Sequence, residues 1–431
     1  MIKIPVVISA PIDTYSGYGA RARDFIKAVI AAKPDWDVRV LSQRWGNTKF
    51  GYLKDHSEDD LNSRILKKLT YKPKVWMQIT VPNEFQAIGE YNIGVTASIE
   101  TTVCDATWVE GVNRMDLTIT SAKHGKTVFE NSQFDVQDKA GKQVKQVKLS
   151  KPVEVLFEGV DLKTYRQVEV TGDEQIIKNL NSIDESFCFL FVGHWLQGEL
   201  GQDRKNVGLM IERFLTTFKG KKNQPALILK TQTANSSVSD QTKILDKIDK
   251  IKKQVGNVNL PSVYFIHGEL SDAEINLLYH HSKVKAMVSL TKGEGFGRPL
   301  LEFSITGKPI IASAWSGHTD FLDVNLSTLI GGKLTNVHPS AVIEKMILAD
   351  SKWFEADPGQ ASAGYKYVFK EYKKALKNSK RQGAVNKRKF SFEKMQETLT
   401  TIFDNNLPNL AVEVAFKMPA PKKILMPKKI K

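Results

Sequence analysis

The sequence contains only two cysteines, Cys104 and Cys188, and no long apolar run. Two cysteines so far apart exclude a disulfide framework and indicate a reducing compartment. A membrane-spanning helix needs about 20 apolar residues, and no run in this chain approaches that length. The N-terminal segment is typical of a β-strand and not of a signal peptide. These absences predict a soluble, cytoplasmic protein without a transmembrane segment.

Acidic residues are scarce only in the C-terminal part of the chain. The formal net charge is +15, and residues 366–389 contain ten Lys or Arg but a single acid, Glu371. Residues 411–431 contain six Lys and one acid, Glu413. Nearly the whole positive surplus therefore lies near the C-terminal end. Two interpretations stay open: a solvated helix face with a flexible tail, or a surface for a polyanion such as DNA or an anionic membrane.

The pattern along the chain alternates short apolar strands with amphipathic helices. A chain of 431 residues is too long for one compact core and predicts two domains. The alternation begins at Val6–Ser9 and starts again with the strongly apolar run Phe187–Val192. Such alternation indicates parallel sheets with helices on both faces. We predict an α/β protein with doubly wound domains over residues 1–160 and 161–390.

Other segments interrupt this alternation. Residues 131–152 are polar and predict an inserted hairpin or mobile loop, while residues 60–69 predict a helix. Residues 162–186 are interpreted as the crossing between the domains. We expect residues 391–407 to form a C-terminal helix that returns to the N-terminal domain, and residues 408–431, with four prolines among lysines, to form a basic flexible tail.

The segment from Ser289 to Glu302 carries the strongest chemical signal. A strand ends near its start, three glycines follow in a tight turn, and Pro299 stands where a helix should begin. The free N–H groups of that helix start can hold an anion such as a diphosphate. Glu294 and Glu302 offer carboxylates to sugar or ribose hydroxyls. By itself, the pattern predicts an anion-binding loop with two carboxylates.

The full string closely resembles the Glu-x7-Glu signature of retaining glycosyltransferases of family four. Residues 307–313 and 316–318 also resemble that family. The resemblance implies the GT-B fold: two facing Rossmann-like domains, the first for the acceptor and the second for the nucleotide-sugar, with the donor in the cleft. It implies that Glu302 holds the ribose and that Glu294 faces the donor sugar. The remaining donor-binding residues of this segment are Gly295, Phe296, Gly297 and Arg298.

A second motif supplies cations. Gly193 ends the first strand of the second domain, and Arg204 and Lys205 begin the next helix, which resembles the family's phosphate-binding arginine and lysine. Cations are needed there because the leaving nucleotide diphosphate gains negative charge. His194 stands where the family has an arginine, and residues 195–203 look like an insertion. We therefore expect Arg204 to take over that role.

The N-terminal domain supplies the opposite face of the predicted site. The loop of Gly17, Tyr18 and Gly19 is similar to the family's glycine loop, which reaches over the donor phosphates and the acceptor. Glu100 and His124 are predicted pocket residues on the acceptor side. The donor-binding set thus includes Gly17, Tyr18, Gly19, Gly193 and His194, and the predicted catalytic set is Glu294, Lys205, Arg204, His124 and Glu100.

The family resemblance also implies a mechanism. It implies front-face attack with retention, in which the departing phosphate oxygen helps to take the acceptor proton. The substrate is then a nucleotide-diphosphate sugar, with a UDP-sugar expected, and no metal or other cofactor is required. The string Asp35-Trp36-Asp37 matches the metal-binding Asp-x-Asp of another glycosyltransferase fold, but it has no nearby acidic partner. We interpret it as an exposed turn.

The acceptor is less defined than the donor. Residues 42–46 and 99–102 resemble glycosyltransferases of tailed phages, several of which glycosylate hydroxymethylated cytosine in DNA. Together with the basic segments 366–389 and 411–431, this makes 5-hydroxymethylcytosine in phage DNA the leading acceptor and the host cytoplasm the expected location. A surface polysaccharide, a lipid-linked saccharide and a protein side chain stay open, as does the oligomeric state.

Two other classes of function were weighed against this interpretation. A glycosidase needs two carboxylates flanking the scissile bond, whereas Glu294 and Glu302 lie on either side of a glycine-rich anion site. A non-catalytic DNA-binding protein on the same scaffold would not need Glu294, Lys205 and Glu302. The sequence therefore favours a transferase over both.

Overall fold

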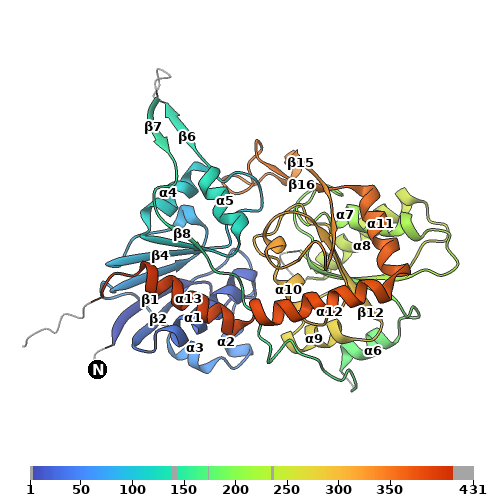
Figure 1. Ribbon diagram of the computed structural model, residues 1–431, viewed down its shortest axis with the longest axis horizontal. Helices are drawn as coiled ribbons and strands as arrows, with labels where there is room; N and C mark the ends of the chain where they lie inside the picture. Colours follow the sequence, from blue (N-terminus) through green and yellow to red (C-terminus); the bar gives the residue numbers. More distant parts are fainter. Residues whose placement is uncertain (1–2, 138–142, 173, 234–236, 411–431) are drawn as a thin grey trace, which may run out of the picture.

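A computed structural model describes residues 3–137, 143–172, 174–233 and 237–410. In it, two α/β domains face each other (Figure 1). Each domain is built on a six-stranded parallel sheet. The predicted architecture of two facing Rossmann-like domains is therefore confirmed.

The first sheet has the strand order β2-β1-β3-β4-β5-β8. Its inner strand residues alternate between two cores: Val6 and Ile8 pack with α1, whereas Val7 packs on the other face with Trp76. Burial on both faces explains why the strands are almost uniformly apolar. The elements are β1 (Ile4–Ala10), α1 (Gly17–Ala32), β2 (Trp36–Ser42), α2 (Tyr52–Asp55), α3 (Asp59–Ser63), β3 (Val75–Ile79), η1 (Pro82–Glu84), β4 (Tyr91–Thr96), α4 (Ala106–Arg114), β5 (Leu117–Thr120), α5 (Lys123–Asn131) and β8 (Val153–Val155).

The second sheet has the order β11-β10-β9-β12-β13-β14. Phe189 and Leu190 again point into different cores, one on each face. The elements are α6 (Gln175–Asn181), β9 (Cys188–His194), α7 (Val207–Phe218), β10 (Ala226–Gln232), α8 (Val238–Val255), β11 (Val263–Ile266), α9 (Asp272–His280), β12 (Val284–Ser289), α10 (Arg298–Ser304), β13 (Ile310–Ser313), η2 (Gly317–Asp320), β14 (Thr328–Ile330), η3 (Pro339–Ala341), α11 (Pro358–Lys370) and α12 (Tyr372–Lys389).

Two local predictions need correction. The helix expected over residues 60–69 is only α3, which ends at Ser63. Beyond it, Ile65 pairs in parallel with Val40 of the edge strand β2, and the amide of Leu66 donates to the carbonyl of Val40. The open edge of a sheet offers unpaired backbone groups, and this pairing replaces the helix.

The segment over residues 162–186 is more than a crossing, because it contains α6. Three apolar residues of this helix, Ile176, Ile177 and Leu180, are buried in the core beneath the second sheet. The helix has only seven residues and is flanked by polar residues, so that the sequence pattern did not predict it.

The chain crosses between the domains twice, and the two crossings touch. The amide of Val160 donates to the carbonyl of Phe390, and the amide of Phe392 donates to the carbonyl of Val160, both at 2.9 Å. Beyond the second crossing, α13 (Phe392–Asn406) packs on α1, with Met395 and Phe403 buried in the N-terminal core. Figure 1 shows α12 and α13 following one another from one domain to the other.

A second bridge joins the domains at the opposite side of the cleft. The hairpin of β15 (Gly332–Asn336) and β16 (Lys352–Ala356), with the segment between its strands, leaves the C-terminal domain. Trp353 of this hairpin is buried in the same core as Trp108 of α4 and Phe129 of α5. The amide of Thr102 also donates to the carbonyl of Lys352 at 2.9 Å. The two domains thus share a hydrophobic core.

The polar residues 131–152 contain a hairpin of β6 (Phe134–Gln137) and β7 (Gln143–Val147), which projects from the N-terminal domain (Figure 1). Its tip, residues 138–142, lies outside the described residues, as does most of the expected tail, residues 411–431.

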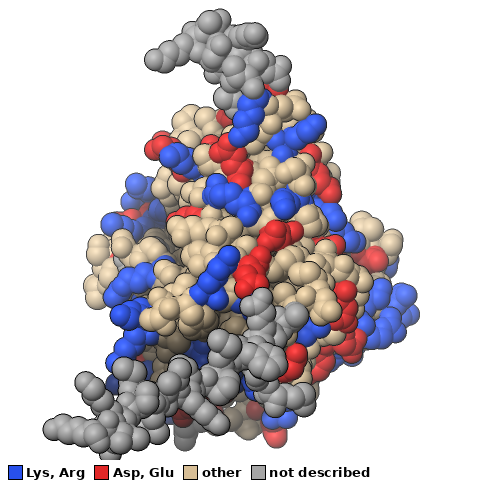
Figure 2. Space-filling view, turned by 90° about the vertical axis from the view of Figure 1, so that its left-hand side faces the viewer, with Lys and Arg blue, Asp and Glu red and all other residues tan. Residues whose placement is uncertain are grey.

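The basic segment 366–389 differs in charge from the face of the N-terminal domain. Viewed from the N-terminal domain, Lys and Arg are interspersed with Asp and Glu (Figure 2). In residues 366–389, by contrast, all ten Lys and Arg side chains are exposed. The aromatic residues within and just before this segment pack inward: Tyr365 is fully buried, and the rings of Phe369 and Tyr372 pack edge-on against Phe187. The basic face of this region therefore carries charge without exposed stacking rings.

Replacing Trp353 by alanine tests the shared core. We expect the free energy of unfolding to fall by about 3–5 kcal/mol, because the cavity left by a buried tryptophan cannot collapse fully. Urea denaturation followed by circular dichroism measures the change. The control Val324→Ala removes an exposed side chain and should leave stability unchanged. Equal stability of the two variants would show that the bridge does not contribute to the fold.

Candidate active site

The glycine-rich loop between β12 and α10 touches the backbone of the other domain. A methyl group on Gly293 would lie 2.0 Å from the carbonyl oxygen of Glu100, and one on Gly295 would lie 2.8 Å from that of Ala97. Both contacts are with the loop that follows β4. We expected these glycines to let the backbone approach a ligand; in this structure they also let the two domains meet. Gly297, with φ of 95°, adopts the left-handed conformation that favours glycine.

Four charged side chains form one network across this contact. The Lys205 Nζ lies 2.5 Å and 2.7 Å from the two carboxylate oxygens of Glu294. The Arg204 Nη1 lies 3.1 Å from Glu100 Oε1 and 3.8 Å from Glu294 Oε2. The structure thus brings together four of the five predicted catalytic residues. Burial alone would raise the pKa of Glu294, but Lys205 and Arg204 outweigh it and hold that pKa below its ordinary value.

Backbone hydrogen bonds fix this network in place. Arg204 Nη1 donates to the carbonyl of Gly293 at 3.0 Å, and the amide of Glu294 donates to Ser316 Oγ at 2.9 Å. The amide of Gly317 donates to the carbonyl of Glu294 at 3.0 Å. The carboxylate of Glu294 is therefore held by its loop as well as by its cationic partners.

The fifth predicted catalytic residue, His124, lies at the start of α5. Burial lowers its pKa to about 4, so that the imidazole is neutral at neutral pH. Its ring packs edge-on against Trp315 at 4.7 Å, and its Nε2 has no hydrogen-bond partner among the described residues. A neutral imidazole with a spare nitrogen suits a hydroxyl group better than a phosphate.

His318 was noticed only as part of a motif and not as a site residue. It is fully buried, and its Nε2 lies 2.6 Å from the carbonyl oxygen of Ser313. A methyl group on Gly297 would lie 3.0 Å from the His318 Cβ. His318 thus supports the glycine-rich loop from behind.

Glu302 and Arg298 are paired on the first turns of α10. The Arg298 Nε donates to Glu302 Oε1 at 2.7 Å, and its Nη1 donates to Asp24 Oδ2 on α1. Burial raises the pKa of Glu302 to about 7, although Arg298 opposes the shift. Asp24 was absent from the predicted site, because nothing near it in the sequence links it to a segment 274 residues away.

The loop before α1 is arranged by its own hydrogen bonds. Ser16 caps the helix by accepting from the amide of Gly19 at 2.9 Å. A methyl group on Gly19 would lie 2.3 Å from the carbonyl oxygen of Thr14, so that glycine is required by packing within the loop. The Tyr18 hydroxyl lies 3.1 Å from both Thr96 Oγ1 and the amide of Ala97, and its ring stacks on Trp45 at 4.0 Å.

Two neighbouring cavities open along the cleft beside this loop. One, of about 560 Å³, is lined by Gly17, Trp45, His194 and Glu269 among others. The other, of about 350 Å³, shares Gly17 and Glu269 and reaches Arg298. Gly193 precedes His194 at the end of β9, where the His194 Nδ1 lies 3.1 Å from the carbonyl oxygen of Thr233. Burial lowers the pKa of His194.

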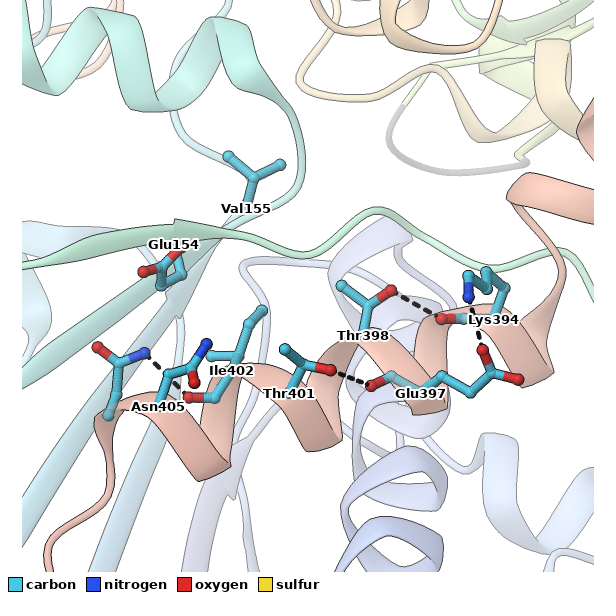
Figure 3. Close-up of a pocket in the computed structure, with 9 residues that line it drawn as sticks. Glu154, Val155, Lys394, Glu397, Thr398, Thr401, Ile402 and Asn405 are labelled. Atoms are coloured by element: carbon cyan, nitrogen blue, oxygen red, sulfur yellow. Dashed lines mark hydrogen bonds and ion pairs between the residues drawn. The ribbon is translucent and has the colours of Figure 1, made fainter.

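A further cavity, of about 410 Å³, lies between β8 and α13, away from all the predicted site residues (Figure 3). Several of its polar side chains bond within α13: Thr398 donates to the carbonyl of Lys394, whose Nζ lies 2.6 Å from Glu397. This cavity contains none of the predicted site residues, and the interdomain cleft is therefore the candidate site.

Within the described part of the chain, no cluster of three or more His, Cys, Asp or Glu side chains is suited to hold a metal ion. The Asp-x-Asp string is not the exposed turn that we predicted: Trp36 and Asp37 begin β2, Trp36 is buried, and Asp37 is paired with Arg39 at 3.0 Å. Among the described residues, none of the helices combines the length and the hydrophobicity that a membrane span requires.

Comparison with known proteins supports a glycosyltransferase of the GT-B fold. Residues 244–330, which include the glycine-rich loop, match the family model described as "Glycosyl transferases group 1". No curated protein sequence matches the chain.

Solved structures resemble the chain over nearly its whole length. Anabaena HepE in complex with UDP-glucose has 12% identity and a TM-score of 0.60, with 93% of this chain and 100% of that one covered. Sucrose-phosphate synthase of Thermosynechococcus elongatus has 13% identity and a TM-score of 0.60, covering 94% and 99%. A UDP-forming trehalose-phosphate synthase of Burkholderia vietnamiensis has 9% identity and a TM-score of 0.58, covering 94% and 99%. At these identities, the likeness establishes the fold.

The contact of the glycine-rich loop with the other domain can be tested with Gly293→Ala. The added methyl group would collide with the carbonyl of Glu100, and we expect transferase activity to fall about 100-fold, as for a misplacement of roughly 1 Å. The control Gly359→Ala puts its methyl group 3.2 Å from a side-chain oxygen of Asp357, away from the cleft. Steady-state kinetics and melting temperatures measure both variants. Full activity of Gly293→Ala would contradict the tight contact.

Proposed function

We propose that this protein is a retaining glycosyltransferase that moves a sugar from a UDP-sugar to an acceptor hydroxyl. The observation that carries the proposal is the network of Arg204, Lys205 and Glu294 in the cleft, beside the glycine-rich loop. It places two cations and a carboxylate next to the backbone amides of the glycine-rich loop, as transfer from a phosphorylated donor requires.

Each group in the network has a distinct task in this proposal. Lys205 and Arg204 bind the diphosphate and stabilise the charge that develops on it. Glu294, released from Lys205 by the incoming phosphate, then accepts hydrogen bonds from hydroxyls of the donor sugar. The amides of Gly295, Phe296 and Gly297 complete the phosphate site, while Glu302 holds the ribose and neutral His124 bonds a sugar hydroxyl. The UDP named in the structures of HepE and of the trehalose-phosphate synthase supports UDP as the carrier.

Retention follows in this proposal from the family resemblance. Attack comes from the same face as departure, and an oxygen of the leaving phosphate takes the acceptor proton. The protein then has to bind and orient the two substrates, exclude water and stabilise the leaving group. The buried network and the close contact of the domains support these tasks.

For the acceptor, we propose 5-hydroxymethylcytosine in phage DNA. The ten exposed basic side chains in residues 366–389 support a polyanionic partner, and the resemblance to phage enzymes supports this base. A surface polysaccharide or lipid-linked saccharide is the second candidate, because anionic surfaces attract the same charges.

Glu294→Gln tests the donor site. We expect transfer and donor hydrolysis to fall about 100- to 1,000-fold, since the amide cannot replace the carboxylate in the network. A panel of UDP-sugars, with product configuration followed by NMR, gives both the donor and the stereochemistry. The exposed Glu344→Gln serves as the control. Full activity of Glu294→Gln, or an inverted product, would refute the proposed mechanism.

The acceptor is tested by incubating hydroxymethylated DNA with the protein and the same UDP-sugars, followed by mass spectrometry of the nucleosides. We expect the mass of one sugar on the modified cytidine, and DNA binding that weakens with salt with a logarithmic slope of about −0.9 per phosphate contacted. The triple variant Lys373→Glu, Lys377→Glu and Arg381→Glu should reduce that slope, whereas Lys243→Glu, Lys250→Glu and Lys253→Glu on α8 should not. No added mass with any donor would exclude this acceptor.

A further inference from the structure

Arg298 joins two carboxylates that belong to different domains. Its Nε bonds Glu302 at 2.7 Å within α10, and its Nη1 bonds Asp24 on α1. The side chains of Arg298, Asp24 and Glu302 are 24%, 22% and 7% exposed, so that solvent screens these pairs only in part. The two carboxylates together raise the pKa of Arg298 well above its ordinary value despite burial, and the guanidinium is permanently charged.

The first crossing between the domains lies next to these ion pairs of Arg298. Glu158 lies in this crossing, and its carboxylate is 3.8 Å from Arg21, one turn before Asp24 on α1. The Arg21 Nη2 donates to the carbonyl of Leu156 at 3.1 Å. The helix α1 is therefore tied to the crossing by Arg21 and to the start of α10 by Asp24. Charges of α1, the crossing and α10 meet at one place beside the cavity that Arg298 lines.

We propose that Arg298 and Asp24 are positioning residues for the donor nucleotide. They orient the Glu302 carboxylate and make its orientation depend on the contact of α1 with α10. This inference rests on the proposed function, in which Glu302 holds the ribose. One guanidinium bonds both carboxylates. The Glu302 carboxylate is therefore held in the orientation that binds the ribose only when α1 lies against α10. Donor binding and domain contact then stabilise one another.

The charge balance around Glu302 explains why an arginine is needed there. Besides Arg298 on its own helix, Glu302 is faced by Asp272 and Tyr279 of α9 and by Tyr165 of the segment before α6. Of these groups, only Arg298 is cationic. Burial raises the pKa of Glu302 to about 7, Arg298 opposes this rise, and Asp272 adds to it. Without Arg298, the carboxyl would be protonated at neutral pH and would accept hydrogen bonds less well.

The proposal predicts the direction in which UDP affinity changes with pH. In the native protein, we expect UDP affinity to weaken as pH falls through about 7, because Glu302 becomes protonated. Removing the cation raises the pKa of Glu302 further, so that Arg298→Gln should shift this loss toward higher pH. Arg298→Lys keeps a positive charge and should retain most of the native pH profile. Asp24→Asn leaves the pair of Arg298 with Glu302 intact and should weaken UDP binding without shifting the profile.

The test measures UDP affinity by calorimetry between pH 6 and 9, and the donor KM and kcat for transfer. We expect Arg298→Gln to weaken UDP binding and raise KM about tenfold at pH 7, with a smaller change in kcat. Recovery at pH 9 should be only partial, because Glu302 is then ionised but still lacks the partner that orients it. In the Arg298→Gln background, Asp24→Asn should add little, because both substitutions act through the same side chain.

A matched control comes from the ion pair at the C-terminal end of α1. Asp404→Asn breaks the pair of Lys33 with Asp404, which joins α1 to α13, and should change neither affinity nor pH profile. Melting temperatures identify folding defects; if Arg298→Gln fails to fold, Arg298→Lys and Asp24→Asn carry the test. Absence of UDP binding by the native protein would refute the proposed function. Native UDP binding that Arg298→Gln and Asp24→Asn leave unchanged, in strength and pH dependence, would refute the positioning role alone.

Discussion

The approach of two backbones, Gly293 to Glu100 and Gly295 to Ala97, sets the geometry of the whole cleft. Because no side chain separates these loops, Arg204 reaches Glu100 on one side and Glu294 on the other. The ion pairs are therefore largely removed from water, where the attraction between charges is stronger than at a surface. A bulkier residue at either position would separate the charged groups together with the backbones.

Removal from water also costs free energy, and this cost explains the pairing. A buried carboxylate is tolerated only with a cation close by, as Glu294 has in Lys205 and Glu302 has in Arg298. A phosphorylated donor brings its own negative charges. It can replace Glu294 as the partner of Lys205 and leave that carboxylate to the sugar. The two cations and two carboxylates of the network balance one another, and an anionic substrate can take the place of one carboxylate.

Local sequence patterns predicted both sheets, because strands buried on two faces are apolar throughout, as in Val6, Val7 and Ile8. The motif around Glu294 predicted the loop and its preceding strand. Asp24 could not be found in this way, since its role depends on a partner in the other domain, and domain contacts have no period in the sequence. For the same reason, the packing of Trp353 on α4 and α5 could not be predicted from the sequence. The helix expected over residues 60–69 failed because pairing with an edge strand replaced it.

The packing of α13 on α1 has a consequence for the order in which the protein matures during synthesis. The N-terminal domain is made first, yet part of its core, including Met395 and Phe403, belongs to the last described helix. The C-terminal domain has its whole sheet before that helix emerges from the ribosome. The sheet of the domain made second is therefore available before the N-terminal core is complete, and the apolar face of α1 stays uncovered until α13 has left the ribosome.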